Sequence, residues 1–264
     1  MTVVRQVTSR HNDLFKDLRK LLAEPAAYRK LGRVWLEGDH LCRALLERGR
    51  APRRAIVTET AWATPALEAL ARNAPEVVCI PDALMRELSG LESPAPIGFM
   101  IDADTAAVPQ PGRDTVVLDR LQDPGNVGSI LRTASAMGFA QVVALKGSVA
   151  LWSPKVLRAG MGAHFALTLV EGASIADVAA LGLPIVGTHL RDAQWLHDTT
   201  LPTPLAWVFG HEGQGMGDAV TAACTQRVRI AQPGGEESLN VAAAAAMCLY
   251  ESARQRAVQS SLRA

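Results

Sequence analysis

Three stretches in the second half of the sequence combine backbone suited to ligand binding with side chains that could act on a substrate. The first, residues 232–240, is a loop rich in glycine and polar residues, between a short apolar strand at 228–231 and an alanine-rich helix. A strand that leads into a glycine loop and then a helix N-terminus exposes main-chain amides to a ligand. Ser238 or Asn240 is suited to cap this helix, because the side-chain oxygen of either can accept a hydrogen bond from a free amide.

A second glycine loop ends the stretch PLAWVFGHEGQGMG at 204–217, in which a buried strand leads into closely spaced glycines. A zinc-protease helix does not fit, because the position four residues after His211, where a second histidine is needed, is glycine. The glycine spacing misses the dinucleotide pattern by one residue, no acidic residue ends a strand about 20 residues further on, and no Gly-Lys-Ser or Gly-Lys-Thr marks a P-loop. Neither glycine loop contains lysine or arginine, which predicts a site without a cation and a ligand without phosphate groups.

The third stretch, LQDPGNVGSILRTASAMG at 121–138, begins with Asp-Pro-Gly-Asn turn chemistry and continues as a helix from residue 127 to 137. It carries Asn126 in the turn and Arg132 within the first two helical turns. A cation there gains nothing from the helix dipole, which favours anions at that end. Arg132 is therefore either an ordinary surface arginine or a residue kept for chemistry.

Alternating strands and helices are predicted to position these three stretches in a doubly wound α/β domain at 113–264. The preceding segment, 104–112, contains two prolines and a glycine without periodic pattern, and we interpret it as a linker. A smaller α/β domain at 1–103 comes before it. The predicted elements of the smaller domain are helices at 11–23, 65–73 and 82–88, a helix capped by Asp39 that runs to residue 49, and strands at 33–37, 55–58, 77–80 and 97–101. Those of the larger domain are strands at 115–119, 142–145, 165–170 and 184–188 and helices at 154–161 and 175–181.

Charge is distributed unevenly along the chain. Residues 1–54 hold 13 Lys or Arg against 6 Asp or Glu, whereas the remainder holds 14 against 20, although the net charge is only +1. A basic N-terminal third on an acidic body suggests contact with a polyanion, and a solvated basic surface is the alternative.

Composition describes a soluble chain of about two domains. Of its 264 residues 48% are apolar and 20% charged, which allows a sizeable core. No run of about 18 apolar residues occurs, and the N-terminus has no apolar core of signal-peptide length. The four cysteines lie apart in apolar segments, so buried free thiols in the cytoplasm are favoured over disulfides or a zinc site; they are Cys42, Cys79, Cys224 and Cys248.

Taken together, the three stretches resemble the SpoU (TrmH) branch of the SPOUT RNA methyltransferases. The motifs, in family order and with family spacing, are D-P-G-N-V-G-x3-R at 123–132, V-F-G-x-E-G-x-G-M at 208–216 and I-x3-G-x3-S-L-N-V at 230–241. The third departs from the family at Ala231, where proline is usual, and at Ala242, where serine is usual. Less specifically, residues 35–101 resemble the ribosomal-protein-like RNA-binding domain that many members carry.

The resemblance implies a C-terminal parallel sheet with a deep trefoil knot, a homodimer, and S-adenosylmethionine as the cofactor, without a metal. The knot would bring the two glycine loops, at 210–217 and 232–240, together as the cofactor cleft. Adenine would be held by main chain near Gly210, Ile230 and Leu239. The residues implied in cofactor binding are Thr188, Gly210, Glu212, Gly213, Gly215, Ile230, Gly234, Leu239 and Asn240.

The implied reaction is methyl transfer to a ribose 2′-hydroxyl of structured RNA, either ribosomal or transfer RNA. In the family, Arg132 is the residue taken to activate the hydroxyl, although free guanidinium is effectively always protonated. Two accounts remain: a substrate phosphate helps to relay the proton, or Arg132 stabilises the developing alkoxide. Asn126 and Glu212 would orient Arg132 and the substrate, and Ser238 and Asn240 would shape the cleft.

Other interpretations differ in what the cleft does. His211 is interpreted as part of the cleft wall or surface rather than as a base. A nucleotide-dependent Rossmann enzyme is disfavoured by the missing cation and acidic partner. A catalytically silent RNA-binding protein that retains the fold is the alternative function, and the intact candidate catalytic residues argue against it.

Overall fold

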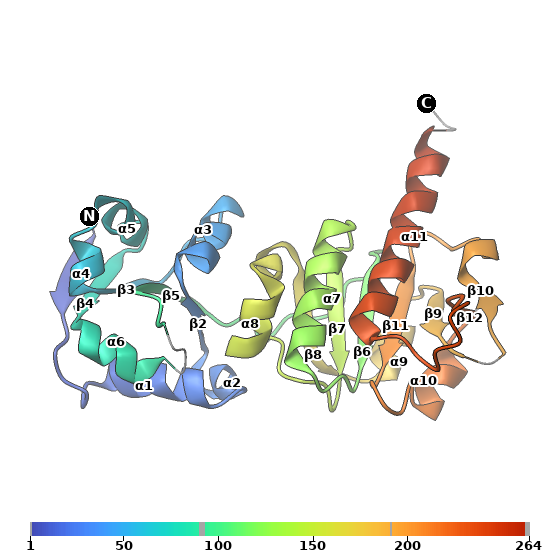
Figure 1. The fold of residues 1–264 in the computed structure, drawn as a ribbon, viewed down its shortest axis with the longest axis horizontal. Coiled ribbons are helices and arrows are strands. Elements are labelled where there is room, and N and C mark those ends of the chain that lie inside the picture. The colour runs from blue at the N-terminus through green and yellow to red at the C-terminus, as the bar shows by residue number, and fades with distance from the viewer. Residues whose placement is uncertain (1, 90–92, 191, 262–264) are drawn as a thin grey trace. The chain divides into compact units, whose positions relative to one another are not determined.

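In a computed structural model, residues 2–89, 93–190 and 192–261 are described, and the chain forms two compact units (Figure 1). The first unit comprises Met1–Thr105 together with Trp152–Phe165, and the second comprises Ala106–Leu151 with Ala166–Ala264. The segment Trp152–Phe165, which carries helix α8 (Pro154–Gly160), therefore groups with the N-terminal unit although it lies within the predicted C-terminal domain.

The first unit contains a five-stranded sheet with the order β1-β4-β3-β5-β2. Strand β5 runs antiparallel to β3 and β2, and the other pairs are parallel. The strands are β1 (Val3–Gln6), β2 (Arg33–Glu37), β3 (Arg54–Thr58), β4 (Glu76–Ile80) and β5 (Ile97–Asp102). The sequence predicted all of these except β1, a fully exposed strand of four residues with no alternating pattern.

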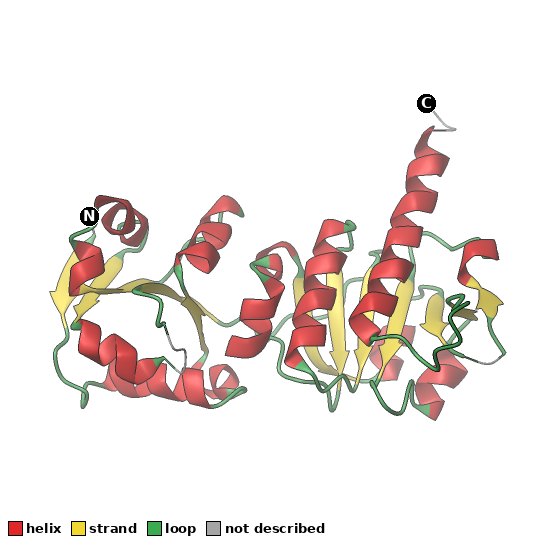
Figure 2. Cartoon of the chain, in the orientation of Figure 1, coloured by secondary structure: helices red, strands yellow, loops and turns green. Residues whose placement is uncertain are grey.

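Helices cover both faces of this sheet. Helices α1 and α6 contact each other on one face, and α3 and α5 contact each other on the other (Figure 2). They are α1 (Asp13–Ala23), α2 (Ala27–Leu31), α3 (Asp39–Glu47), α4 (Glu59–Trp62), α5 (Pro65–Ala71) and α6 (Asp82–Leu88). Helix α1 buries Leu14, Leu18 and Leu21 on its predicted face. The predicted cap of α3 is wrong: Gly38, with φ +99°, occupies the N-cap position, and Asp39 is the first helical residue.

The second unit is built on a seven-stranded, entirely parallel sheet with the order β10-β12-β9-β11-β6-β7-β8. Its strands are β6 (Thr115–Asp119), β7 (Gln141–Leu145), β8 (Thr168–Ala173), β9 (Ile185–Thr188), β10 (Gln194–Trp195), β11 (Ala206–Gly210) and β12 (Gln226–Arg229). Strands β6, β7 and β11 are buried at every residue, as expected for a parallel sheet covered on both faces. The predicted α/β fold with a C-terminal parallel sheet is confirmed.

Two boundaries in this unit differ from the prediction for identifiable reasons. The predicted strand at 165–170 begins only at Thr168, because Ala163–Ala166 forms a 3-10 turn. The predicted strand at 228–231 ends at Arg229, because Ile230 already belongs to the glycine loop. Strand β10 has two residues, too few for a periodic pattern to reveal it.

Helices α7 (Pro124–Ala136) and α11 (Val241–Ser261) contact each other on one face of the parallel sheet, and α9 (Ile175–Ala179) contacts α10 (Asp218–Ala223) on the other (Figure 1). The indole Nε1 of Trp207 in β11 donates to Ser252 Oγ of α11 at 2.8 Å, which fastens this helix to the sheet core. The predicted alanine-rich helix is thus confirmed as α11.

Helix α11 also exposes an apolar stripe of three side chains, interrupted by Arg254 and its ion pair with Glu251. Met247, Tyr250 and Val258 are 43%, 58% and 49% exposed, and their spacing of three and eight residues places them on one side of the helix. None of the described helices combines the length and the apolar character needed to cross a membrane.

Candidate functional site

A cavity of about 610 Å³ lies at the carboxyl ends of β9, β11 and β12. In open parallel sheets this is the edge at which ligands bind. Two glycine loops, one after β11 and one after β12, form most of its wall. The predicted site residues that line it are Thr188, Gly210, Glu212, Gly213, Gly215, Ile230, Ser238 and Leu239. Gly234 and Asn240 lie in the same loop as Ser238 but are not part of the lining.

The loop after β11 folds tightly back on itself. His211 and Gly215 exchange backbone hydrogen bonds of 3.0 and 2.8 Å, and His211 Nδ1 accepts a third from the amide of Gly213 at 3.0 Å. A Cβ added at Gly210 would lie 2.3 Å from the nitrogen of Met216, so only glycine fits there. Because the Nδ1 lone pair of His211 holds the loop, the structure supports the interpretation of this residue as part of the cleft wall.

A chain of polar contacts joins the three motifs. Glu212 Oε1 accepts from the backbone amide of Asp123 and from Asn126 Nδ2, both at 3.2 Å, and its Oε2 accepts from the amide of Gln122 at 3.2 Å. Asn126 Oδ1 in turn accepts from Asn240 Nδ2 at 2.9 Å. Asn126 and Asn240 are 114 residues apart in sequence, so the fold converges on this point.

The carboxyl group of Glu212 is held in its charged form. Partial burial opposes the charge, but hydrogen bonds from its own backbone amide, from the Asn126 side chain and from two neighbouring amides outweigh burial and lower its pKa. A carboxylate that accepts from these donors organises its neighbours and is poorly placed to give or take a proton. We therefore assign Glu212 a positioning role.

The N-cap of α11 is Asn240. Its Oδ1 accepts from the backbone amides of Ala242 at 2.9 Å and Ala243 at 3.2 Å, which satisfies two of the free amides at the start of the helix. Of the two predicted alternatives, the structure thus selects Asn240, while Ser238 lines the cavity. Capping and the bond to Asn126 use both ends of the Asn240 side-chain amide.

Arg132 lies outside this network. It is six residues after Asn126 on α7, its side chain is exposed, and no hydrogen bond or ion pair links it to another of the described residues. Within this chain the structure places Glu212 and Asn126 against each other and not against Arg132. A free guanidinium is available to a substrate or to a second molecule.

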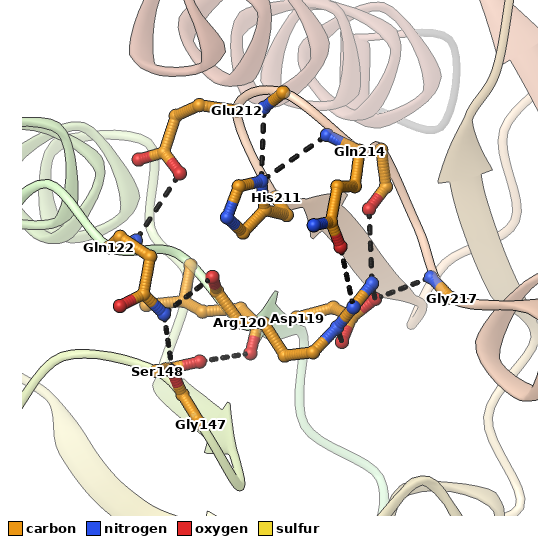
Figure 3. A network of polar contacts seen from close by, with 12 residues as sticks. Asp119, Arg120, Gln122, Gly147, Ser148, His211, Glu212, Gln214 and Gly217 are labelled. Carbon is orange, nitrogen blue, oxygen red and sulfur yellow. Dashed lines mark hydrogen bonds and ion pairs between the residues drawn. The ribbon is translucent and has the colours of Figure 1, made fainter.

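A second set of contacts, which the sequence did not reveal, joins Asp119 and Arg120 to the loop after β11 (Figure 3). The buried carboxylate of Asp119 accepts from the amide of Gly217 at 2.8 Å and from Arg120 Nε at 3.0 Å. Arg120 also donates to Gln214 Oε1 at 3.2 Å and to the carbonyl of Gly215 at 3.4 Å. Arg120 adopts φ +58°, a left-handed conformation that directs its side chain under the loop and that no pattern in the sequence predicts.

The cavity contains a cation, contrary to the prediction. Arg229, the last residue of β12, lines the cavity together with Gln232 of the following loop. The prediction considered only the two glycine loops, which contain no lysine or arginine, and overlooked the strand that enters the second of them. The predicted strand at 228–231 placed Arg229 in its interior, whereas β12 ends at this residue, at the edge where ligands bind.

All four cysteines are free thiols. Cys42, Cys79 and Cys248 are buried and Cys224 is partly buried, and burial raises the pKa of the Cys42 and Cys248 thiols. The predicted free thiols are confirmed. In the part of the chain that the structure describes, no group of three or more His, Cys, Asp or Glu could hold a metal ion.

The sequence of this chain is similar to those of known proteins. Residues 114–250 match the model of the SpoU rRNA Methylase family. An uncharacterized tRNA/rRNA methyltransferase of Synechocystis sp. is 31% identical over 262 residues, which cover 96% of this chain and 95% of that protein. The chain belongs to the SpoU rRNA methylase family.

Two further relatives extend over nearly the whole chain. The 23S rRNA (guanosine(2553)-2′-O)-methyltransferase RlmP of Bacillus subtilis is 26% identical over 250 residues, 94% of this chain and 98% of that protein. The crystal structure of an AdoMet-bound rRNA methyltransferase from Sinorhizobium meliloti superposes with a TM-score of 0.83 at 25% identity, covering 95% of this chain and 98% of that one. The predicted family, and with it an S-adenosylmethionine-dependent RNA methyltransferase, is confirmed.

The contacts of Asp119 and Arg120 are expected to hold the shape of the loop after β11, which lines the cavity. Arg120→Gly removes the contacts to Gln214 and Gly215 and also the ion pair with Asp119, which keeps its hydrogen bond from Gly217. Because glycine suits the positive φ at this position, we expect folding to be retained. Loss of these hydrogen bonds is expected to weaken S-adenosylmethionine binding by about 3- to 10-fold. Calorimetric titration measures the affinity, and thermal unfolding is the control; an unchanged affinity would show that the loop keeps its shape unaided.

Proposed function

We propose that this chain transfers the methyl group of S-adenosylmethionine to a ribose 2′-hydroxyl of ribosomal RNA. The convergence of Glu212, Asn126 and Asn240, one from each motif, beside the cavity carries this proposal. RlmP, which matches nearly end to end, is named as a 23S rRNA 2′-O-methyltransferase.

The cavity suits the cofactor in size and chemistry. Its volume of about 610 Å³ lies within the usual range for sites that hold small molecules. Glycine and main-chain groups near Gly210, Ile230 and Leu239 would receive the adenine, and the wall contains no cluster of lysines or arginines suited to a polyphosphate. When bound there, S-adenosylmethionine supplies an activated methyl group for in-line attack.

Side chains at the edge of the cavity and beyond it would prepare the attacking hydroxyl. Glu212 fixes Asn126 and the first turn of α7, and Arg132 follows on the same helix about 9 Å further along the axis. Its guanidinium would donate hydrogen bonds to the 2′-oxygen as negative charge develops, or to a neighbouring phosphate that takes the proton. Both accounts require an exposed, unpaired Arg132 in the absence of RNA, which is the state observed.

We propose further that the chain works in the cytoplasm as a homodimer and that its C-terminal unit contains a trefoil knot, as the family resemblance implies. The apolar stripe of Met247, Tyr250 and Val258 supports the dimer, because an exposed apolar face on a long helix is a typical association surface. This stripe lies on α11, the helix that begins at Asn240, so a second copy would approach the candidate site.

A methyl-transfer assay tests the proposed activity. The purified protein is incubated with radiolabelled S-adenosylmethionine and bulk RNA from cells that lack the protein, and the RNA is digested to nucleosides. We expect label in a 2′-O-methylnucleoside of ribosomal RNA. Label in transfer RNA alone would change the proposed substrate, and RNA binding without any transfer would identify a silent RNA-binding protein.

The first unit is proposed to deliver the RNA. Helix α1 exposes Lys16 and Arg19, and Lys20 and Lys30 line a recess of about 370 Å³ between α1 and α2. Lys16 pairs with Asp13 at 2.9 Å and Arg19 with Glu87 at 3.7 Å. Exposed pairs of this kind contribute little to stability, so RNA phosphates can replace the carboxylates at small cost.

Neutralising Lys16, Arg19 and Lys20 together, each to glutamine, is expected to weaken RNA binding and to reduce its dependence on salt. The slope of log affinity against log salt should become shallower by about 0.7–0.9 for each phosphate contact removed. Because phosphates carry no sequence information, the loss should be similar for different RNAs. Titration of RNA binding over a range of salt concentrations measures this slope.

The matched control neutralises Arg43, Arg48 and Arg72, which lie on the other face of the same sheet. Arg43 is in α3, and Arg48 and Arg72 are the C-cap residues of α3 and α5. Both triple variants lose the same charge. Equal loss of RNA affinity in the two variants would mean that overall charge, and not the α1 surface, attracts the RNA.

A further inference from the structure

Two polar atoms in the cavity wall are buried without a hydrogen-bond partner. They are Nε of Arg229, a donor, and Oε1 of Gln232, an acceptor, and no partner for either exists among the described residues. Buried polar atoms in native proteins are nearly always paired, because an unmet donor or acceptor is costly. An unpaired donor and an unpaired acceptor in one cavity indicate a ligand that carries both a hydrogen-bond acceptor and a hydrogen-bond donor.

The position of Arg229 is restrained by an aromatic ring of the neighbouring strand. Its guanidinium carbon lies 3.7 Å from the ring centroid of Trp195, the residue paired with it in the neighbouring strand β10. A cation over an aromatic face is attracted by the ring and loses part of its freedom. The charge is therefore already in place before a ligand arrives, which lowers the cost of binding.

The charge of Arg229 is also available. Among the described residues that line the cavity it is the only lysine or arginine. Neither of the carboxylates in the described lining, Glu212 and Glu237, forms an ion pair with it. Glu212 is engaged by Asn126 and two backbone amides instead. The cavity thus presents one unneutralised cation to its ligand, close in sequence to an unpaired amide oxygen.

We propose that Arg229 binds the α-carboxylate of S-adenosylmethionine and that Gln232 Oε1 accepts a hydrogen bond from its α-ammonium group. The methionine end of this cofactor is a zwitterion, which offers an anion to the arginine and an N–H donor to the amide oxygen. Guanidinium and carboxylate form the stronger, charge-assisted class of hydrogen bond. The proposal rests on the cavity being the cofactor site and is independent of which RNA is methylated.

The test compares two ligands that differ in this end alone. S-adenosylhomocysteine carries the amino-acid group, whereas 5′-methylthioadenosine keeps the adenosine and the sulfur but lacks the carboxylate and the ammonium. Arg229→Gln is expected to weaken binding of S-adenosylhomocysteine by about 10-fold or more in calorimetric titration. Binding of 5′-methylthioadenosine should change by less than about 2-fold, which also shows that the variant is folded.

Further variants separate the two groups. Gln232→Leu should cause a smaller loss, about 3- to 10-fold, again for S-adenosylhomocysteine only. Arg227→Gln is the matched control, because Arg227 lies on the same strand but lines a separate recess with Asp192 and Cys224, and its variant should bind both ligands normally.

Three results would overturn the proposal. Equal weakening of both ligands by Arg229→Gln would mean that this residue only shapes the cavity. Unchanged affinity for both would mean that the cation serves another anion, such as an RNA phosphate. Failure of the wild-type protein to bind either ligand would show that the cavity is not the cofactor site. A protein that binds both ligands but methylates no RNA would contradict the proposed function and leave the proposal for Arg229 and Gln232 intact.

Discussion

Replacing Arg132 with alanine is expected to lower the rate of methyl transfer by about 100-fold or more. The reason is that the 2′-hydroxyl loses the group that stabilises its developing charge or directs its proton to a phosphate. Binding of S-adenosylmethionine should stay nearly normal, because Arg132 is not part of the cavity lining. Single-turnover rates and calorimetric titration of the cofactor separate the two effects.

The variant Arg132→Lys sharpens this experiment. Lysine keeps the positive charge but lacks the planar fork of five donors, so we expect it to restore little of the rate. Both substitutions are at an exposed position and should leave thermal unfolding unchanged. Near-normal turnover in either variant would remove Arg132 from the mechanism.

Replacing Gly210 with alanine is expected to abolish measurable S-adenosylmethionine binding. The added methyl group would lie 2.3 Å from the nitrogen of Met216 and 2.4 Å from the carbonyl carbon of Gly215, so the loop after β11 would have to move. These are backbone atoms, which cannot swing aside as a flexible side chain does. Calorimetric titration measures the loss, and thermal unfolding shows whether the rest of the fold survives.

Gly234→Ala provides the contrasting variant. The family resemblance implies that Gly234 helps to bind the cofactor, but the structure places no atom within 4 Å of an added Cβ at this position, and Gly234 is outside the cavity lining. We therefore expect Gly234→Ala to retain binding. Equal losses in the two variants would mean that the loop after β12 closes over the cofactor more tightly than this structure shows.

Features governed by local sequence could be predicted well. Strand β6 was predicted with its observed bounds because its first four residues are apolar or β-prone and turn chemistry bounds the segment. The candidates for the N-cap of α11 were limited to Ser238 and Asn240, because only a side-chain oxygen close to the first helical amides can accept hydrogen bonds from them. The glycine loops were recognised because close approach of backbone to a ligand, or to itself as at Gly210, requires glycine.

Features that depend on long-range geometry could not be predicted. The grouping of Trp152–Phe165 with the N-terminal unit arises from tertiary contacts, which no local pattern encodes. The contact of Asp119 and Arg120 with the loop after β11 depends on a left-handed backbone at Arg120 and on a partner 98 residues away from Asp119. Arg229 was overlooked because its direction depends on strand register, and β12 ends two residues before the predicted strand does.

The most direct test of the central claim is a map of ribose methylation in ribosomal RNA from cells with and without this protein. We expect that one 2′-O-methyl group is lost when the protein is absent, that the intact protein restores it, and that the Arg132→Ala variant at the same cellular level does not. An identical methylation map in the two kinds of cell would contradict the proposal that this protein methylates ribosomal RNA. Full restoration by Arg132→Ala would contradict the assigned chemistry.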